Sequence, residues 1–351
     1  MFKLNRVWES DDMSNIFSPI RVKNVNFINR IVMAPMVRFG YPSKNGIMGE
    51  KLLQDYLGRS DKGIGLMISQ VLSVSTEREI AGRAGAYSDQ HIDYLSKIAE
   101  TCHKSGTRFF AQLGLPDFSF YDDNSENVNK LTKQELVKIR DWFIRSAEIC
   151  QKSGLDGIEL HGAHTFFLNM MASSYSNKRQ DTYGGDLIGR LTLVKEITEA
   201  IKSFAGEYFV VSYRMGWGDD LDIDVQTARV LENMGIDMLH VSTGIPEDRK
   251  LQLPMDFQYN DVVYTGCHVK KHVNIPVIAV NNVKTLNRGN VLIENNCCDF
   301  VAYGKPFLAD SDFIKHSRKD SSYKPCFECS ECKWFTNGEK CPAQIIAKAH
   351  S

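Results

Sequence analysis

Four cysteines are grouped near the end of the 351-residue sequence. They read Cys326-x2-Cys329-x2-Cys332-x8-Cys341, and Pro342 follows the last one. Three thiolates at the close spacing wrap one corner of an iron–sulfur cubane, and a more distant cysteine before a proline completes the ligand set. Four thiolates also suit a tetrahedral zinc ion. The spacing therefore predicts a metal site and leaves two occupants open, a [4Fe-4S] cluster and a zinc ion.

The other five cysteines have no framework spacing: Cys102, Cys150, Cys267, Cys297 and Cys298. A secreted disulfide scaffold would be shorter and more regular. The first residues lack the apolar run of a signal peptide, and no stretch is apolar for long enough to span a bilayer. We therefore expect free thiols in a cytoplasmic protein without a membrane segment.

The overall composition is that of a globular protein. Hydrophobic residues make up 43% and charged residues 24%, so the chain can bury a full core. The formal net charge is −1, which gives no electrostatic footprint for nucleic acid or an anionic membrane. A homo-oligomer stays open at this stage.

Short apolar runs alternate with longer helical patterns along the first three hundred residues. The eight runs are residues 30–35, 65–69, 108–113, 157–162, 208–214, 238–242, 276–280 and 299–304. Eight strand-plus-crossover units of this kind predict an α/β fold, the (βα)8 or TIM barrel. A doubly wound sheet is disfavoured because no G-x-G-x-x-G follows any of the runs.

Three further segments complete the expected architecture. Residues 17–30 predict a hairpin that closes the bottom of the barrel, and residues 116–130 predict a polar loop after the third strand. Thr132 and Glu135 form the T-x-x-E pattern of a capping box, so a helix should begin there. Helical patterns also cover residues 91–106 and 225–235.

The domain prediction follows from this order. Residues 1–315 are expected to form the barrel, and residues 316–351 a cysteine-rich appendage packed on it.

Polar or small residues stand where six of the strands should end. Because the carboxyl ends of barrel strands meet at one face, these residues should surround one ligand. The loops after strands seven and eight commonly hold a phosphate, and Lys305 there supplies a positive charge. Gln112 and Arg214 are placed to hydrogen-bond a flat heterocycle.

Several stretches resemble one family of flavoenzymes. HGAHTFFLNMMASSYSNKRQDTYGGDLIGR (161–190) is similar to the signature of the Old Yellow Enzyme family, the NADH:flavin oxidoreductases. RIVMAPMVR (30–38) resembles that family's first strand, and AVNNV (279–283) and YGKPFLAD (303–310) resemble its two phosphate loops. The resemblance implies an FMN-binding barrel that passes hydride from NAD(P)H to the flavin and then to an activated alkene.

The resemblance also implies roles for single residues. Ten would bind FMN: Pro35, Met36, Val37, Ser69, Gln112, Arg214, Asn281, Asn282, Gly304 and Lys305. Of these, Arg214 would lie near the flavin N1, and the last four would hold the phosphate. His161 and His164 would grip the carbonyl oxygen of an α,β-unsaturated substrate and polarise it.

Some positions depart from the family's pattern. Phe166 stands where the family has its proton-donating tyrosine, so Tyr175 is the predicted replacement and Tyr41 the alternative. Val37 cannot hydrogen-bond the flavin carbonyl as a threonine or cysteine would. Lys305 replaces an arginine, which keeps the charge and loses the bidentate fork. We therefore expect an unusual substrate pocket.

The cysteine tail resembles one branch of the family. Trimethylamine dehydrogenase and 2,4-dienoyl-CoA reductase carry a [4Fe-4S] cluster after the barrel at nearly this spacing, followed by a nucleotide-binding half that this sequence lacks. The resemblance therefore implies an external electron partner, such as a reductase. Alternatives are an electron-transfer subunit and an amine dehydrogenase-like oxidation. A tRNA-reducing barrel is disfavoured by the net charge of −1.

Overall fold

Eight parallel strands form a closed barrel in the order β10-β3-β4-β5-β6-β7-β8-β9. The computed structural model describes residues 15–77, 82–115 and 127–349. The barrel strands are β3 (Ile31–Met33), β4 (Leu66–Ser73), β5 (Arg108–Gly114), β6 (Gly157–Gly162), β7 (Val210–Gly216), β8 (Met238–Ser242), β9 (Val277–Ala279) and β10 (Phe300–Tyr303). Each overlaps one of the eight apolar runs, so the predicted (βα)8 barrel is confirmed.

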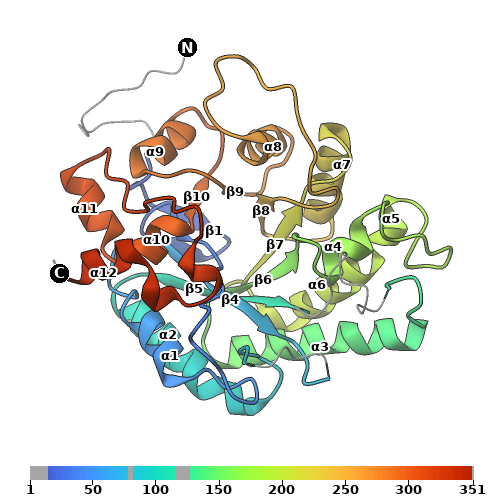
Figure 1. Cartoon of the computed structure of the whole chain (residues 1–351). Coiled ribbons are helices and arrows are strands. Elements are labelled where there is room, and N and C mark those ends of the chain that lie inside the picture. The colour runs from blue at the N-terminus through green and yellow to red at the C-terminus, as the bar shows by residue number, and fades with distance from the viewer. Residues whose placement is uncertain (1–14, 78–81, 116–126, 350–351) are drawn as a thin grey trace.

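Helices form a ring outside the strands, as Figure 1 shows. They are α1 (Glu50–Leu57), α2 (Ile92–Lys104), α3 (Lys133–Lys152), α4 (Phe167–Ala172), α5 (Leu187–Arg190), α6 (Thr192–Ala205), α7 (Leu221–Asn233), α8 (Asp261–Lys270), α9 (Leu286–Glu294), α10 (Lys305–Ala309), α11 (Phe313–Lys319) and α12 (Pro342–Ala349). None of the helices in the described ranges has the length and apolar character needed to cross a membrane.

The predicted helix starts follow local hydrogen bonding. At the start of α3, Thr132 Oγ1 accepts from the Glu135 backbone N–H at 3.2 Å, and Glu135 Oε2 accepts from the Thr132 N–H at 2.7 Å. This is the predicted capping box. Helix α7 begins earlier than predicted because Asp220 caps it. Of the predicted loop, residues 116–126 lie outside the described residues.

A hairpin of β1 (Ile20–Val22) and β2 (Val25–Phe27) closes one end of the barrel. Phe27 is fully buried, and its ring packs edge-on against Phe300 at 5.2 Å and Phe110 at 6.2 Å between centroids. Both partners are barrel residues near the amino ends of their strands. The predicted hairpin plug is thus confirmed, and it leaves the opposite end of the barrel for a ligand.

The C-terminal segment packs on the loop that follows β3. Trp334 is 5% exposed, and its ring stacks on Tyr41 with 6.0 Å between centroids. The Gly338 N–H donates to the Phe39 carbonyl at 3.0 Å. A Cβ at Gly338 would lie 2.2 Å from the Trp334 ring, so only glycine allows this packing.

Two features of this segment were not foreseen. Helix α12 follows Cys341 directly and was not predicted from the sequence. Helix α11 runs across the predicted boundary between residues 315 and 316. That boundary stays a prediction, since nothing in the packing separates the two parts there.

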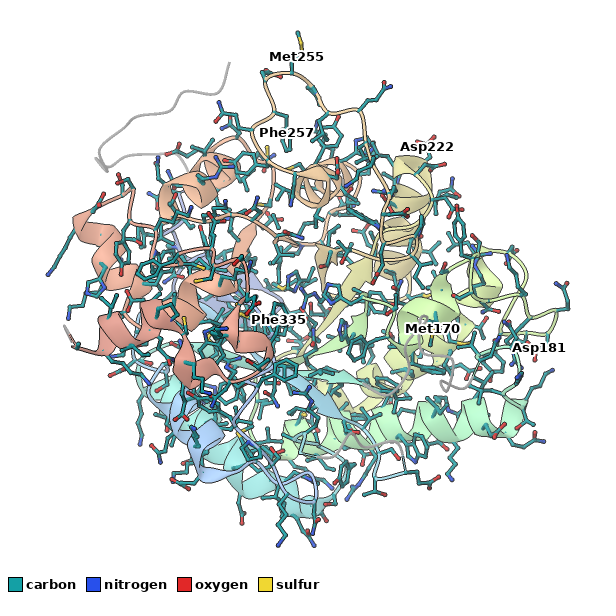
Figure 2. The ribbon with its side chains drawn as sticks, viewed as in Figure 1. Met170, Asp181, Asp222, Met255, Phe257 and Phe335 are labelled. Atoms are coloured by element: carbon teal, nitrogen blue, oxygen red, sulfur yellow. The ribbon has the colours of Figure 1, made fainter. Side chains whose placement is uncertain are left out.

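Replacing Trp334 by alanine should loosen the tail from the barrel. Loss of a buried tryptophan costs about 3 kcal/mol of unfolding free energy. We expect a lower Tm and faster tryptic cleavage at Lys333 and Lys340. Phe335, which is 70% exposed and labelled in Figure 2, offers the matched control, because Phe335→Ala removes little buried surface. Equal effects of the two substitutions would contradict the anchoring role of Trp334.

Candidate active site at the carboxyl end of the barrel

A cavity of about 250 Å³ opens where β3, β7, β9 and β10 end. Its lining includes seven of the ten residues predicted to bind a cofactor: Pro35, Met36, Arg214, Asn281, Asn282, Gly304 and Lys305. Val37, Ser69 and Gln112 are not among the described lining residues. Two larger hollows, of about 340 and about 560 Å³, are lined by helix and loop residues away from these strand ends. The smaller cavity is the candidate site because it gathers the strand-end residues.

One side of the cavity suits an anion. Lys284, Lys305 and Lys324 line it against a single carboxylate, Glu328. A Cβ at Gly304 would lie 3.0 Å from Met36 Sδ, so glycine lets the β3 and β10 ends approach closely. The excess positive charge and the tight backbone fit a phosphate group.

The asparagine pair after β9 has an unusual backbone. Asn281 and Asn282 have φ angles of +88° and +58°. Asparagine tolerates the left-handed region better than most residues, which explains its use at both positions. Asn260 Nδ2 donates to Asn281 Oδ1 at 3.2 Å and so fixes the first of the two side chains.

Arg214 brings a buried cation to the cavity. It is 7% exposed, and its Nε has no hydrogen-bond partner within the described part of the chain. Burial lowers the pKa of Arg214 to about 10, against the opposing pull of Glu159, so the guanidinium stays charged at neutral pH. A ligand with a developing negative charge would meet an unpaired donor here.

Glu159 lies fully buried inside the barrel next to Arg214. Its Oε1 accepts from Gln112 Nε2 at 2.8 Å, and its Oε2 lies 2.7 Å from His240 Nδ1. Burial opposes the carboxylate, but His240, Arg214 and the Gln112 hydrogen bond outweigh it and hold the pKa of Glu159 below its usual range. Gln112 is therefore oriented by Glu159 and does not reach the cavity wall.

The two predicted site histidines lie side by side. The rings of His161 and His164 are 5.2 Å apart at 82°. His164 Nε2 hydrogen-bonds Ser242 Oγ at 2.7 Å, while the buried His161 Nδ1 has no partner among the described residues. Burial, followed by the neighbouring Arg214 and histidines, holds the pKa of both well below the usual range. Both are thus neutral near pH 7.

The loop that carries His164 is held in a rare conformation. His164 and Thr165 have φ angles of +57° and +63°, and a β-branched residue seldom adopts this region. The Thr165 N–H donates to Asn169 Oδ1 at 3.0 Å, and the His164 N–H donates to the Thr243 carbonyl at 3.1 Å. A strained backbone of this kind persists only where many surrounding contacts hold it in place, as happens at binding sites.

Phe166 and its two predicted replacements as proton donor, Tyr175 and Tyr41, have different surroundings. The Phe166 ring packs on His161 with 4.3 Å between centroids. Tyr175 is 51% exposed on the loop after α4 and does not line the described cavity. Tyr41 is stacked on Trp334 and lines a different hollow. The role predicted for Tyr175 stays a prediction.

Ser69 lies at a register shift between β4 and β5, which interrupts the pairing between Ile68 and Val71. Its hydroxyl accepts from the Gln112 N–H at 3.1 Å and donates to the Gln70 carbonyl at 2.7 Å. These bonds hold the β5 backbone beside Gln112.

Glu159, His240 and Ser242 were missed as site residues. Each is a polar residue inside an otherwise apolar strand run, GIELHG or MLHVS. A buried charge needs a partner, and that signal could have identified Glu159 and His240 as a pair.

The four tail cysteines surround one small hollow of about 20 Å³. Cys326, Lys305 and Glu328 line both this hollow and the candidate site. Within the described chain, however, no group of three or more His, Cys, Asp or Glu residues is arranged to hold a metal ion. All nine cysteines are free thiols. The predicted metal appendage is therefore not confirmed.

Comparison with known proteins adds to this geometry. The profile of the NADH:flavin oxidoreductase / NADH oxidase family matches residues 15–126 and 116–322. The chain is 29% identical to an NADH oxidase of Thermoanaerobacter brockii over 344 residues, which covers 90% of this chain and 53% of that protein. It is also 29% identical to an NADPH dehydrogenase of Clostridium acetobutylicum over 327 residues, or 87% of this chain and 94% of the relative. The chain thus spans about half of one relative and nearly all of the other.

Two solved structures share the fold. Morphinone reductase superposes with a TM-score of 0.75 at 20% identity and covers 96% of each chain. A 2-naphthoyl-CoA reductase complex superposes with a TM-score of 0.76 at 17% identity, over 87% of this chain and 52% of that one.

The buried neutral histidines predict how stability depends on pH. The pKa values of His161, His164 and His240 are lowered by folding, so below about pH 6.5 the unfolded chain binds more protons than the folded one. The unfolding free energy should be flat above this pH and fall below it, by up to about 1.4 kcal/mol per pH unit for each histidine.

Urea unfolding at pH 7.5 and pH 5.5 measures this slope. His164→Asn should make it shallower, because the unfolded chain then has one histidine fewer that gains a proton. A wild-type stability that rises toward pH 5.5 would contradict the assignment of neutral imidazoles.

Proposed function

Since the chain belongs to the NADH:flavin oxidoreductase / NADH oxidase family, we propose that it reduces the activated C=C bond of an α,β-unsaturated carbonyl compound with FMN as its cofactor. One observation carries this proposal. A cavity at the carboxyl end of the barrel combines the buried cation of Arg214, whose Nε has no partner among the described residues, with a lysine-rich rim, and a neutral imidazole pair lies at the end of the adjoining strand β6.

The residues present fit FMN. Asn281, Asn282, Gly304 and Lys305 would hold its phosphate, since they line the positively charged side of the cavity. Pro35 and Met36 would lie along the flavin ring, with Val37 and Ser69 beyond them. Bound FMN supplies a site that takes up hydride from NAD(P)H and delivers it to a second substrate.

Arg214 would stabilise negative charge on the flavin's pyrimidine side. Its Nε is buried without a partner, so a ligand acceptor there would satisfy a donor that the protein leaves open. Glu159 partly balances this cation from within the barrel, and Gln112 is oriented by the same carboxylate. In the proposed complex, both groups would lie beneath the flavin ring.

His161 and His164 would bind the substrate's carbonyl oxygen. Neutral imidazoles donate a hydrogen bond without releasing a proton, and two donors to one oxygen draw electrons from the alkene's β-carbon. Ser242 fixes the His164 ring, while His161 Nδ1 has no partner among the described residues and is free to bind a ligand. The α-carbon still needs a proton, and Tyr175 is the proposed donor. Because Tyr175 is exposed, its loop would have to close over the substrate.

Rapid mixing of the photoreduced, FMN-loaded protein with 2-cyclohexen-1-one tests the proposal. Flavin reoxidation under anaerobic conditions should be fast in the wild type and slower by about 10²-fold in His164→Ala, because one oxyanion donor is lost. His268→Ala, on the outer helix α8, is the matched control. The proposal fails if FMN binds and no electron-poor alkene reoxidises it.

A second function, electron transfer between the flavin and a partner protein, is favoured by the position of the tail. We propose that Cys326, Cys329, Cys332 and Cys341 hold a [4Fe-4S] cluster, with zinc as the alternative. The four thiols surround one hollow, and Cys326 also lines the candidate FMN cavity. The C-x2-C-x2-C spacing with a more distant cysteine before a proline is the support for the cluster over zinc. A partner reductase would then replace NAD(P)H as the electron donor.

No amine oxidation is proposed. A cationic amine is usually held by an aromatic cage, and none of the described residues that line the candidate cavity is aromatic.

Purification without oxygen distinguishes the metals. A cluster should give a broad absorption shoulder near ~400 nm and about four iron atoms per chain. Cys329→Ser should abolish both signals, while Cys102→Ser, which changes a buried thiol on α2, should keep them. Zinc without iron would support the alternative, and the absence of both metals would contradict a metal site in the tail.

A further inference from the structure

Three buried charged side chains lie in contact with one another close to the candidate cavity. Arg38 is in the loop after β3, Asp55 is in α1, and Arg59 follows the end of that helix. Asp55 Oδ2 lies 3.1 Å from Arg38 Nε, and Asp55 Oδ1 lies 2.9 Å from Arg59 Nη2. The two arginines are 2% and 3% exposed, and none of the three is among the described residues that line the cavity. They would therefore act on a bound ligand only through other residues.

Each arginine also holds a backbone carbonyl of a segment that lines the cavity. Arg38 Nη1 donates to the Met36 carbonyl at 2.5 Å, and Met36 lines the cavity after β3. Arg59 Nη1 donates to the carbonyl of Phe307, which follows Lys305 in α10. Lys305 lines the same cavity. One carboxylate thus links the end of β3 to the start of α10 through two guanidinium groups.

A third connection runs to the bulge in β4. Gln70 follows Ser69 at the register shift between β4 and β5. The Gln70 backbone N–H donates to the Tyr56 hydroxyl at 2.6 Å, and Gln70 Oε1 accepts from the Arg38 N–H at 3.1 Å. The Arg38 guanidinium also lies over the Tyr56 ring, 4.9 Å from its centroid. Through these contacts, α1 is joined to three segments that carry predicted FMN residues.

We propose that Asp55, Arg38 and Arg59 are positioning residues for the FMN site, with Arg38 setting the ring side and Arg59 the phosphate side. The inference rests on the FMN site proposed above. Burying ionic groups costs free energy, and apolar side chains of similar volume often give equal or greater stability. The geometry that the network fixes is therefore its better explanation, because each planar guanidinium joins a carboxylate and a carbonyl in set directions.

The charges of this network allow either arginine to be removed alone. Burial opposes the charged form of Asp55, but Arg59 and Arg38 outweigh burial and lower the pKa of Asp55 to about 2. Replacing Asp55 would leave two buried cations without their counter-ion, which destabilises the fold. Replacing one arginine instead leaves a balanced pair of one cation and one carboxylate. Single arginine variants therefore remove one connection and keep the remaining charges paired.

Titration of the full-length, flavin-free protein with FMN and with riboflavin separates the two sides. Riboflavin has the same ring without the phosphate, and the change in flavin fluorescence reports the binding of either. Arg59→Met should raise the Kd of FMN on the order of tenfold and leave the Kd of riboflavin unchanged, because the phosphate loses one well-placed hydrogen bond. Arg38→Met should raise both Kd values by the same factor.

A second variant at the phosphate side separates charge from geometry. In Arg59→Lys the ammonium group stays charged and can pair with Asp55, so the buried carboxylate keeps both of its counter-ions. The lysine lacks the planar fork that also reaches the Phe307 carbonyl. The ratio of the two Kd values should therefore change as in Arg59→Met, although the fold keeps its ion pairs.

Arg249→Met is the matched control, because it removes a buried arginine with the same kinds of partner. Arg249 is 7% exposed, pairs with Asp224 at 2.7 Å and donates to the Gly218 carbonyl at 2.9 Å. It is not among the described residues that line the cavity. This variant should lower the Tm and leave both Kd values unchanged.

Two results would overturn this inference alone. A Kd ratio that keeps its wild-type value in both Arg59 variants would mean that Arg59 only supports the fold. A changed ratio in Arg249→Met would mean that the loss of any buried ion pair has this effect. A wild type that binds neither flavin would instead contradict the proposed FMN site itself, and this inference with it.

Discussion

The buried carboxylate of Glu159 is the interaction on which the candidate site depends. It lies at the centre of the barrel on β6, hydrogen-bonds Gln112 on β5 and His240 on β8, and is attracted to Arg214 on β7. A lone carboxylate at this depth would cost several kcal/mol. With these partners it instead ties four neighbouring strands together. Two of the partners, Gln112 and Arg214, are the residues expected at the flavin's pyrimidine edge, so one internal charge orients both.

In the same region, burial and the nearest charged partner decide whether a side chain is charged or neutral. Arg214 keeps its proton because Glu159 offsets part of its desolvation, whereas no carboxylate from the described ranges stabilises a proton on His161 or His164, and both are neutral. Two kinds of donor therefore face the carboxyl end of the barrel. The cation suits charge that develops on a ring, and the imidazoles suit a polarised carbonyl oxygen. The cationic donor and the imidazole donors are in place without a conformational change, because the folded barrel holds these side chains.

The sequence predicted the parts of the fold that depend on local pattern. Strands buried on both faces are continuous apolar runs, so all eight were found. Strand ends lie at one face, which is why seven of the ten predicted cofactor residues line one cavity, although their roles stay predictions. The Glu159–His240 pair was missed because its members lie 81 residues apart and each looks like an isolated polar residue within a strand. The bulge at Ser69 and the stacking of Trp334 on Tyr41 depend likewise on contacts between distant segments.

The tail is held by such distant contacts, and this makes its position part of the site. Trp334 and Gly338 fix it to the loop after β3, while Glu328 pairs with Lys284 at 2.5 Å and also with Lys324. These two lysines line the candidate cavity, so the tail's carboxylate offsets part of the positive charge there. The segment that carries the four cysteines therefore helps to set the charge that a phosphate would meet. A tail detached from the barrel would leave Lys284 unpaired and expose the rim of the cavity, so cofactor binding and tail packing should be coupled through Glu328.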